Sequence, residues 1–119
     1  MIHPGLPGFP NVRSPDGSVE VAFCVEEMRM SLFVQEPVVY RVRDERVVLD
    51  LCGTRLDAHG DITFPGPGQV RLVLRRYPRG DRVRYDLVVD VERETFRIGE
   101  EPEHPLNRIG SAIPGASGG

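Results

Sequence analysis

The sequence predicts an all-β protein, a small antiparallel β-sandwich or barrel of about eight strands. Three observations support this fold class. Between residues 18 and 98, apolar side chains occupy every second position of successive short runs, which is the period of a strand with one face toward a core. Turn-forming residues separate these runs at intervals of roughly 8 to 12 residues. No segment carries a convincing helical pattern.

The first two runs differ in phase. Residues 19–25 place their large apolar side chains on odd positions, whereas residues 28–34 place them on even positions. A change of phase by one residue sends every side chain to the opposite face. We therefore expect a bulge or tight turn near Glu26-Glu27. Pro37 is expected to end the second run.

The remaining runs are joined by recognisable turns. Residues 38–42 and 47–51 alternate on either side of Asp44-Glu45, a pattern that favours a hairpin even without glycine. Pro65-Gly66-Pro67-Gly68 is the strongest turn signal in the chain. Further strands are expected at residues 62–64, 70–74, 83–91 and 96–98.

Both ends of the chain have a different composition from the middle. The 119 residues include 11 prolines, and most of them lie outside the alternating region. Segments rich in proline and glycine and poor in apolar pattern are typical of loops and disorder. We therefore expect a Pro/Gly-rich N-terminal tail at 1–17, an antiparallel β domain at 18–98 and a disordered C-terminal tail at 99–119.

Composition and charge restrict the function classes. All 15 basic residues are arginine and the formal net charge is −3, so no global basic field favours nucleic acid. No apolar run reaches the roughly 18 residues that would predict a membrane span. The first seven residues lack a charged region followed by an apolar one, so a secretory signal is not predicted and the cytoplasm is the expected location. Arginine in place of lysine is typical of GC-rich codon usage and gives the chain a bacterial appearance.

The cysteines and histidines give weak signals. Cys24 and Cys52 are expected to be reduced, partly buried thiols, because the cytoplasm keeps cysteines reduced. His3, His59 and His104 are not spaced as metal ligands, and no metal or cofactor is expected. Cys52 and His59 are near in sequence, so a hydrolase that uses this pair is one alternative function.

A group of arginine and tyrosine residues forms the strongest candidate site. Its members all flank one predicted hairpin loop. They are Arg75, Arg76, Tyr77, Arg79, Arg82 and Arg84. Loops on a rigid sheet often carry binding residues, and Arg and Tyr are enriched where interfaces are strongest. On the strand that follows, Asp86 and Asp90 are expected to form cross-strand ion pairs with Arg71 or Arg75.

These observations favour a non-catalytic module that binds a protein partner through an acidic patch on that partner. Such a module would neutralise or regulate its partner, as small toxin-neutralising immunity proteins do; that comparison rests on size and composition. A β domain that binds a small anion or sugar is a further alternative. Charged residues on the expected outer faces protect sheet edges from pairing, so we expect a monomer or weak homodimer.

Overall fold

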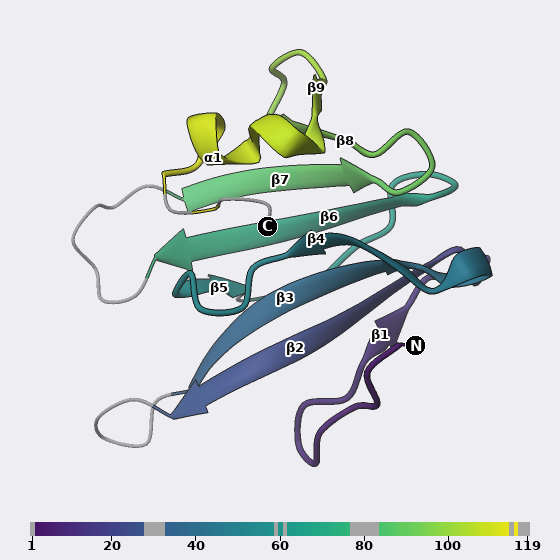
Figure 1. Ribbon diagram of the computed structural model, residues 1–119, viewed down its shortest axis with the longest axis vertical. Coiled ribbons are helices and arrows are strands. Elements are labelled where there is room, and N and C mark those ends of the chain that lie inside the picture. Colours follow the sequence, from purple (N-terminus) through teal and green to yellow (C-terminus); the bar gives the residue numbers. More distant parts are fainter. Residues whose placement is uncertain are drawn as a thin grey trace.

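The computed structural model describes residues 2–27, 33–58, 60, 62–76, 84–114 and 116. These residues form a four-stranded and a five-stranded antiparallel sheet, arranged as two layers, together with one short helix (Figure 1). The all-β class predicted from alternating hydrophobicity is confirmed.

The first sheet has the strand order β1-β2-β3-β4. Its strands are β1 (Val12–Arg13), β2 (Val19–Glu27), β3 (Phe33–Arg41) and β4 (Arg46–Asp50). A 3-10 turn, η2 (Val42–Asp44), connects β3 to β4, and Glu45 follows it with a φ of 55°. This confirms the hairpin expected around Asp44-Glu45.

The expectation that Pro37 ends a strand is wrong. β3 continues through this residue, which pairs with Phe23 of β2. The carbonyl oxygen of Pro37 accepts a hydrogen bond from the amide of Leu51 at 3.1 Å, so this side of the residue faces β4. The ladder between β3 and β4 begins only at Val38. The proline nitrogen therefore lies where the sheet needs no donor.

The phase change expected near Glu26-Glu27 does not disturb β2. Pairing between β2 and β3 is regular from Val19 opposite Arg41 to Glu27 opposite Phe33. The connection at 28–32 lies outside the described residues. A register shift is present elsewhere in this sheet, between β3 and β4 at Val39/Tyr40.

The second sheet has the strand order β5-β6-β7-β8-β9. Its strands are β5 (Leu56–Ala58), β6 (Gln69–Arg76), β7 (Arg84–Asp90), β8 (Thr95–Ile98) and β9 (His104–Pro105). The Pro-Gly-Pro-Gly turn precedes β6, and Gly68 has a φ of +70°, which glycine adopts without strain. In place of the short strand expected at 62–64, Thr63 makes an isolated bridge with Arg71.

One hydrophobic core lies between the two sheets. The first sheet contributes Val19, Val21, Val39 and Leu49. From the second sheet come Leu56, Val70, Leu72, Leu74, Tyr85, Leu87, Val89 and Phe96. In β6, β7 and β8 these are the alternating positions that the sequence pattern assigns to an inner face, whereas the strand that carries Leu56 is not predicted.

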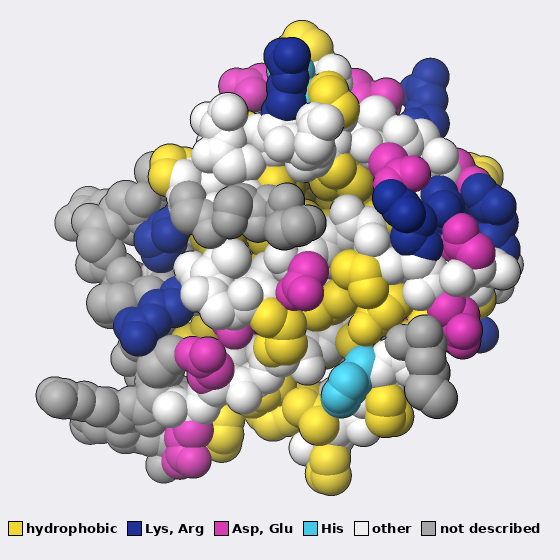
Figure 2. Space-filling view, viewed as in Figure 1, with side chains coloured by type: hydrophobic (Ala, Val, Ile, Leu, Met, Phe, Trp, Pro, Cys, Tyr) yellow, Lys and Arg dark blue, Asp and Glu magenta, His cyan; other side chains and the backbone are white. Residues whose placement is uncertain are grey.

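Charged side chains connect the two sheets at the end of the molecule where η2 lies. Exposed ion pairs join Arg43 to Glu92 at 3.1 Å and Arg46 to Glu94 at 2.9 Å. Figure 2 shows basic and acidic side chains interleaved over this end. Arg41 is buried behind them and reaches the second sheet directly.

The C-terminal segment differs from the disorder expected for it. Part of it forms a second 3-10 turn, η3 (Leu106–Arg108), and the one-turn helix α1 (Ile109–Ala112). Its apolar side chains join the common core. They are Leu106, Ile109, Ile113 and Ala116. Residues 104–114 are therefore part of the folded unit.

The N-terminal segment also makes specific contacts. Leu6 and Phe9 form an isolated β-bridge, and the ring of Phe9 lies 5.4 Å from that of Phe33. Ile2 packs on the face of the first sheet that points away from the core, against Val38 and Tyr40. This segment therefore covers part of a sheet face that alternation alone would leave open to solvent.

Candidate functional site

The predicted arginine–tyrosine loop is divided by the structure. Tyr77, Arg79 and Arg82 lie outside the described residues. Arg75, at the end of β6, and Arg84, at the start of β7, are directly opposite each other and both are exposed. Directly opposite residues of an antiparallel pair project from the same face. The side chains of Arg75 and Arg84 therefore both project from the outer face of the second sheet.

Arg76 does not join this pair. Its guanidinium Nη2 donates a hydrogen bond to the carbonyl oxygen of Pro114, in the C-terminal segment. Successive side chains of a strand point to opposite faces, so Arg76 points away from the face that carries the exposed Arg75. The contact assigns Arg76 a structural role in holding the C-terminal segment, which sequence reasoning missed because it treated that segment as disordered.

Around the Arg75–Arg84 pair, the positive charge of the arginines is only partly compensated by acidic side chains. Asp57 lies opposite Arg75 on the β5 side, and its Oδ1 accepts a hydrogen bond from the Gln35 amide at 2.8 Å. Among the described residues, neither Arg75 nor Arg84 forms a salt bridge. Like charges directly opposite each other on neighbouring strands destabilise a sheet.

Asp86 is already occupied by another arginine. Its two carboxylate oxygens accept hydrogen bonds from Nε and Nη2 of Arg71, both at 2.6 Å. These bonds, with weaker contributions from the charges of Arg84 and Arg97, lower the pKa of Asp86. The predicted cross-strand ion pair of Asp86 is confirmed. Asp86 is thus held by Arg71 in a two-bond arrangement, not by Arg84.

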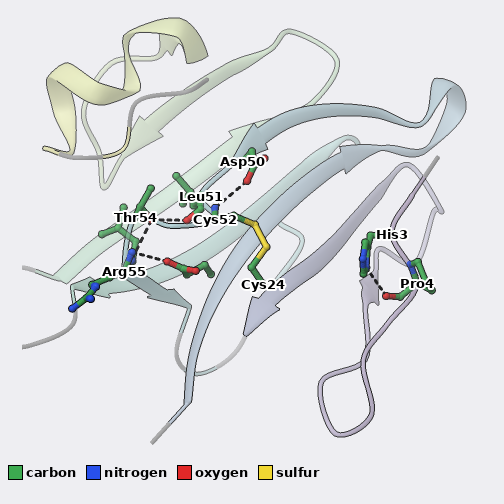
Figure 3. Close-up of a disulfide and its surroundings, with 10 residues drawn as sticks. His3, Pro4, Cys24, Asp50, Leu51, Cys52, Thr54 and Arg55 are labelled. Atoms are coloured by element: carbon green, nitrogen blue, oxygen red, sulfur yellow. Dashed lines mark hydrogen bonds between the residues drawn. A yellow bond between two sulfur atoms is a disulfide. The ribbon is translucent and has the colours of Figure 1, made fainter. Parts of the chain in front are cut away.

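The expectation of two reduced cysteines is wrong. Cys24 and Cys52 form a disulfide, with Cα atoms 5.6 Å apart. Figure 3 shows this bond joining β2 to the turn that follows β4. No local sequence pattern indicates this bond, because the two residues are 28 positions apart. A disulfide sulfur has no thiolate to act as a nucleophile, and His59 lies outside the described residues. The hydrolase hypothesis therefore has no support from this geometry.

A cavity of about 540 Å³ opens beside this disulfide. It lies on the outer face of the first sheet, between that sheet and the N-terminal segment. Cys24 and Cys52 form part of its wall, and Tyr40, Val47 and Leu6 also line it. Figure 2 shows hydrophobic side chains gathered over β2 and β3 on this face, with a histidine beside them. Its volume is in the range of small-molecule sites.

One residue of this cavity was not singled out from the sequence. Glu36 follows Gln35 in the middle of β3 and is 0% exposed. Its Oε2 accepts a hydrogen bond from the Arg55 amide at 2.6 Å, whereas its Oε1 is buried and has no hydrogen-bond partner in the described part of the chain. The available signal is a glutamate in a strand whose other residues are mostly apolar. Buried carboxylates are uncommon unless they are paired.

No protein-family model, curated protein or solved structure matches this chain. Within the part of the chain that the structure describes, no helix is long and apolar enough to cross a membrane. The Arg75–Arg84 surface and the cavity beside the disulfide are therefore the features that bear on function.

Proposed function

We propose that this chain is a non-catalytic protein-binding module that contacts an acidic patch on its partner. The contact surface is the outer face of the second sheet around Arg75 and Arg84. The proposal rests mainly on one observation, the placement of these two exposed guanidinium groups opposite each other on adjacent strands. An acidic partner would replace their mutual repulsion with charge-assisted hydrogen bonds.

A protein is favoured over nucleic acid as the acidic partner. The net charge of −3 gives no long-range attraction for a polyanion. Six further arginines are held in ion pairs with carboxylates of the same chain. They are Arg13, Arg41, Arg43, Arg46, Arg71 and Arg93. A compact pair of arginines suits a local carboxylate cluster, which arginine recognises with two parallel hydrogen bonds.

The cellular compartment is inferred from the disulfide and not from the Arg75–Arg84 surface. The sequence favoured the cytoplasm, where thiols are kept reduced. The disulfide between Cys24 and Cys52 favours an oxidising compartment instead, because disulfides persist there and are rare in the cytosol. We infer that the partner is encountered under oxidising conditions, and that the chain acts as a monomer or weak homodimer.

The test is affinity capture with matched baits, read by mass spectrometry. The variants are Arg75→Glu and Arg84→Glu, and the control is Arg108→Glu, which makes the same charge change at an exposed position of η3. We expect one stoichiometric partner with the native protein and with the control, and its loss with both variants. Higher salt should weaken capture as well.

Two results would overturn the proposal. One is a partner that both variants retain as well as the native protein does. The other is the absence of any stoichiometric partner from oxidising and reducing extracts alike. Thermal unfolding of each bait shows whether a lost partner reflects lost folding. Arg84→Glu is exposed and should remain folded.

A further inference from the structure

The cavity on the outer face of the first sheet contains an unsatisfied buried carboxylate. Glu36 is opposite Cys24 in the β2–β3 register, and both residues line the cavity. Among the described residues, the Oε1 atom of Glu36 has no hydrogen-bond partner, and it is shielded from solvent. Leaving a buried acceptor unpaired destabilises the fold, and more so when the group is charged. A bound donor would remove that cost.

The polar groups of the cavity are acidic. Among the described residues that line it, Glu26, Glu36 and Asp50 carry carboxylates and none is an arginine. This is notable in a chain whose 15 basic residues are all arginine. His3 also lines the cavity, but its Nδ1 is engaged with the carbonyl oxygen of Pro4 at 2.9 Å. The site therefore attracts cations and repels anions.

The rest of the wall is apolar and held in place. Val38 and Tyr40 are 7% and 6% exposed, and both line the cavity. Figure 3 shows that the turn carrying Cys52 is fixed by the disulfide and by short hydrogen bonds around it. In that turn the Cys52 amide donates to Asp50 at 2.9 Å, and the Thr54 hydroxyl donates to the carbonyl oxygen of Leu51 at 2.6 Å. A preformed wall reduces the ordering cost of binding.

We propose that this cavity binds a small organic ammonium ion. The cationic head lies against the Glu36 carboxylate and the apolar portion lies against Val38 and Val47. Oε1 becomes accessible when the Glu36 side chain turns toward the cavity, and the ammonium group then supplies the hydrogen-bond donor that Oε1 lacks, with a charge that the carboxylate favours. The ring of Tyr40 adds an aromatic surface on which a cation is stabilised. This site lies on the first sheet and is separate from the Arg75–Arg84 surface.

The proposed ammonium ion is opposite in charge to the small anion that, like a sugar, is an alternative ligand on sequence grounds. Among the described residues, no arginine lines this cavity, whereas three carboxylates do. A neutral sugar would leave the charge of Glu36 without compensation, whereas an amine compensates it.

Three probes of equal chain length test the charge preference: hexylammonium, hexanol and hexanoate. Binding is measured by calorimetry, and the site is read from the NMR signals of the methyl groups of Ala22, Val38 and Val47. We expect hexylammonium to bind with about millimolar affinity or better. Hexanol and hexanoate should bind about tenfold more weakly, since each lacks the charge-assisted hydrogen bond. The protein carries no added residues at its N-terminus, because His3 and Leu6 line the cavity.

Two variants locate the binding site. Glu36→Gln keeps the shape and an acceptor for the Arg55 amide but removes the charge, and it should weaken hexylammonium binding about tenfold. Ala22→Leu places a larger side chain at a cavity-lining position and should abolish binding without touching Glu36. Glu103→Gln removes one carboxylate at an exposed site outside the cavity and should leave binding unchanged.

Several outcomes would overturn the proposal. They are equal binding of the three probes, no binding of hexylammonium at several millimolar, and unchanged binding in Ala22→Leu. If Glu36→Gln fails to fold, Ala22→Leu and the comparison of probes still decide the question. Shifts confined to methyl groups outside the cavity would place the ligand elsewhere and would also contradict it.

Discussion

Arg41 of β3 bonds directly to the second sheet: its Nη1 donates a hydrogen bond to the carbonyl oxygen of Val91, just after β7, at 3.1 Å. The same side chain donates to both carboxylate oxygens of Asp44, at 2.9 and 2.7 Å. Arg41 is only 7% exposed. One residue of the first sheet thus fixes both its own hairpin and the position of the second sheet.

Arg41→Lys should therefore lower the melting temperature by several degrees. Lysine keeps the charge but cannot make two parallel bonds to Asp44 and a third to Val91. Thermal unfolding monitored by circular dichroism measures the effect. Arg43→Lys is the matched control, because Arg43 makes only an exposed pair with Glu92 and exposed pairs contribute little. Equal shifts in the two variants would show that the cross-sheet contact does not stabilise the fold.

Acid should destabilise the protein through two aspartates. Hydrogen bonds from Ser14 and Ser18 lower the pKa of Asp16 to about 2, and those from Arg41 lower the pKa of Asp44 to about 2, both from 3.8. A carboxylate whose pKa is lower in the folded state stabilises the fold above its unfolded pKa. That stability is lost as the pH falls from 3.8 to about 2.

Asp16→Asn tests this pH dependence. The variant should be less stable than the native protein at neutral pH, because it loses a charged acceptor for the hydroxyls of Ser14 and Ser18. Its stability should also fall less steeply over the acidic range, since one linked proton is removed. Urea unfolding at a series of pH values gives both quantities. Parallel curves for the two proteins would contradict the role of Asp16.

Removing the disulfide should cost about 3 kcal/mol of unfolding free energy, because it closes a loop between residues 28 positions apart. The double variant Cys24→Ala, Cys52→Ala and the reduced native protein should unfold at similar, lower urea concentrations. Denaturant unfolding with and without a reductant makes the comparison. Rapid alkylation of thiols in the folded, unreduced protein would show that the bond does not form.

Ile109→Ala should destabilise the fold by about 2 to 5 kcal/mol, the usual range for truncating a buried isoleucine. Ile109 is 0% exposed and belongs to the common core. Asn107→Ala, at an exposed neighbouring position, should change stability by less than about 0.5 kcal/mol. Unfolding by urea measures both. If Ile109→Ala were as stable as the native protein, the C-terminal segment would not be part of the core.

Most strands could be predicted because each buries one face. The alternation around Leu72 and Leu74 fixes the direction of β6, and that around Leu87 and Val89 fixes β7; all four side chains are in the core. The hairpin at Asp44-Glu45 and the ion pair of Asp86 with Arg71 followed from the same local rules. Such features depend on neighbours in sequence or on adjacent strands.

The missed features depend on distant contacts or on a weak pattern. The disulfide joins residues whose proximity arises only when β2 and the turn after β4 come together. The burial of Glu36 likewise depends on chain 19 residues away, at Arg55. The C-terminal segment did carry a signal: Leu106, Ile109 and Ile113 are spaced by three and four residues, as on a helix. The surrounding prolines and glycines outweighed that spacing.

The lengths of the outer strands bear on how this molecule associates with others. β1 and β9 each contain only 2 residues, and β5 contains 3. A strand this short offers too few free amide and carbonyl groups to template the addition of another chain. Growth by edge-to-edge pairing is thus blocked at three of the four sheet borders among the described residues. The remaining border, β4, has 5 residues and is where another chain could extend a ladder, so contacts elsewhere should form through side chains on the faces.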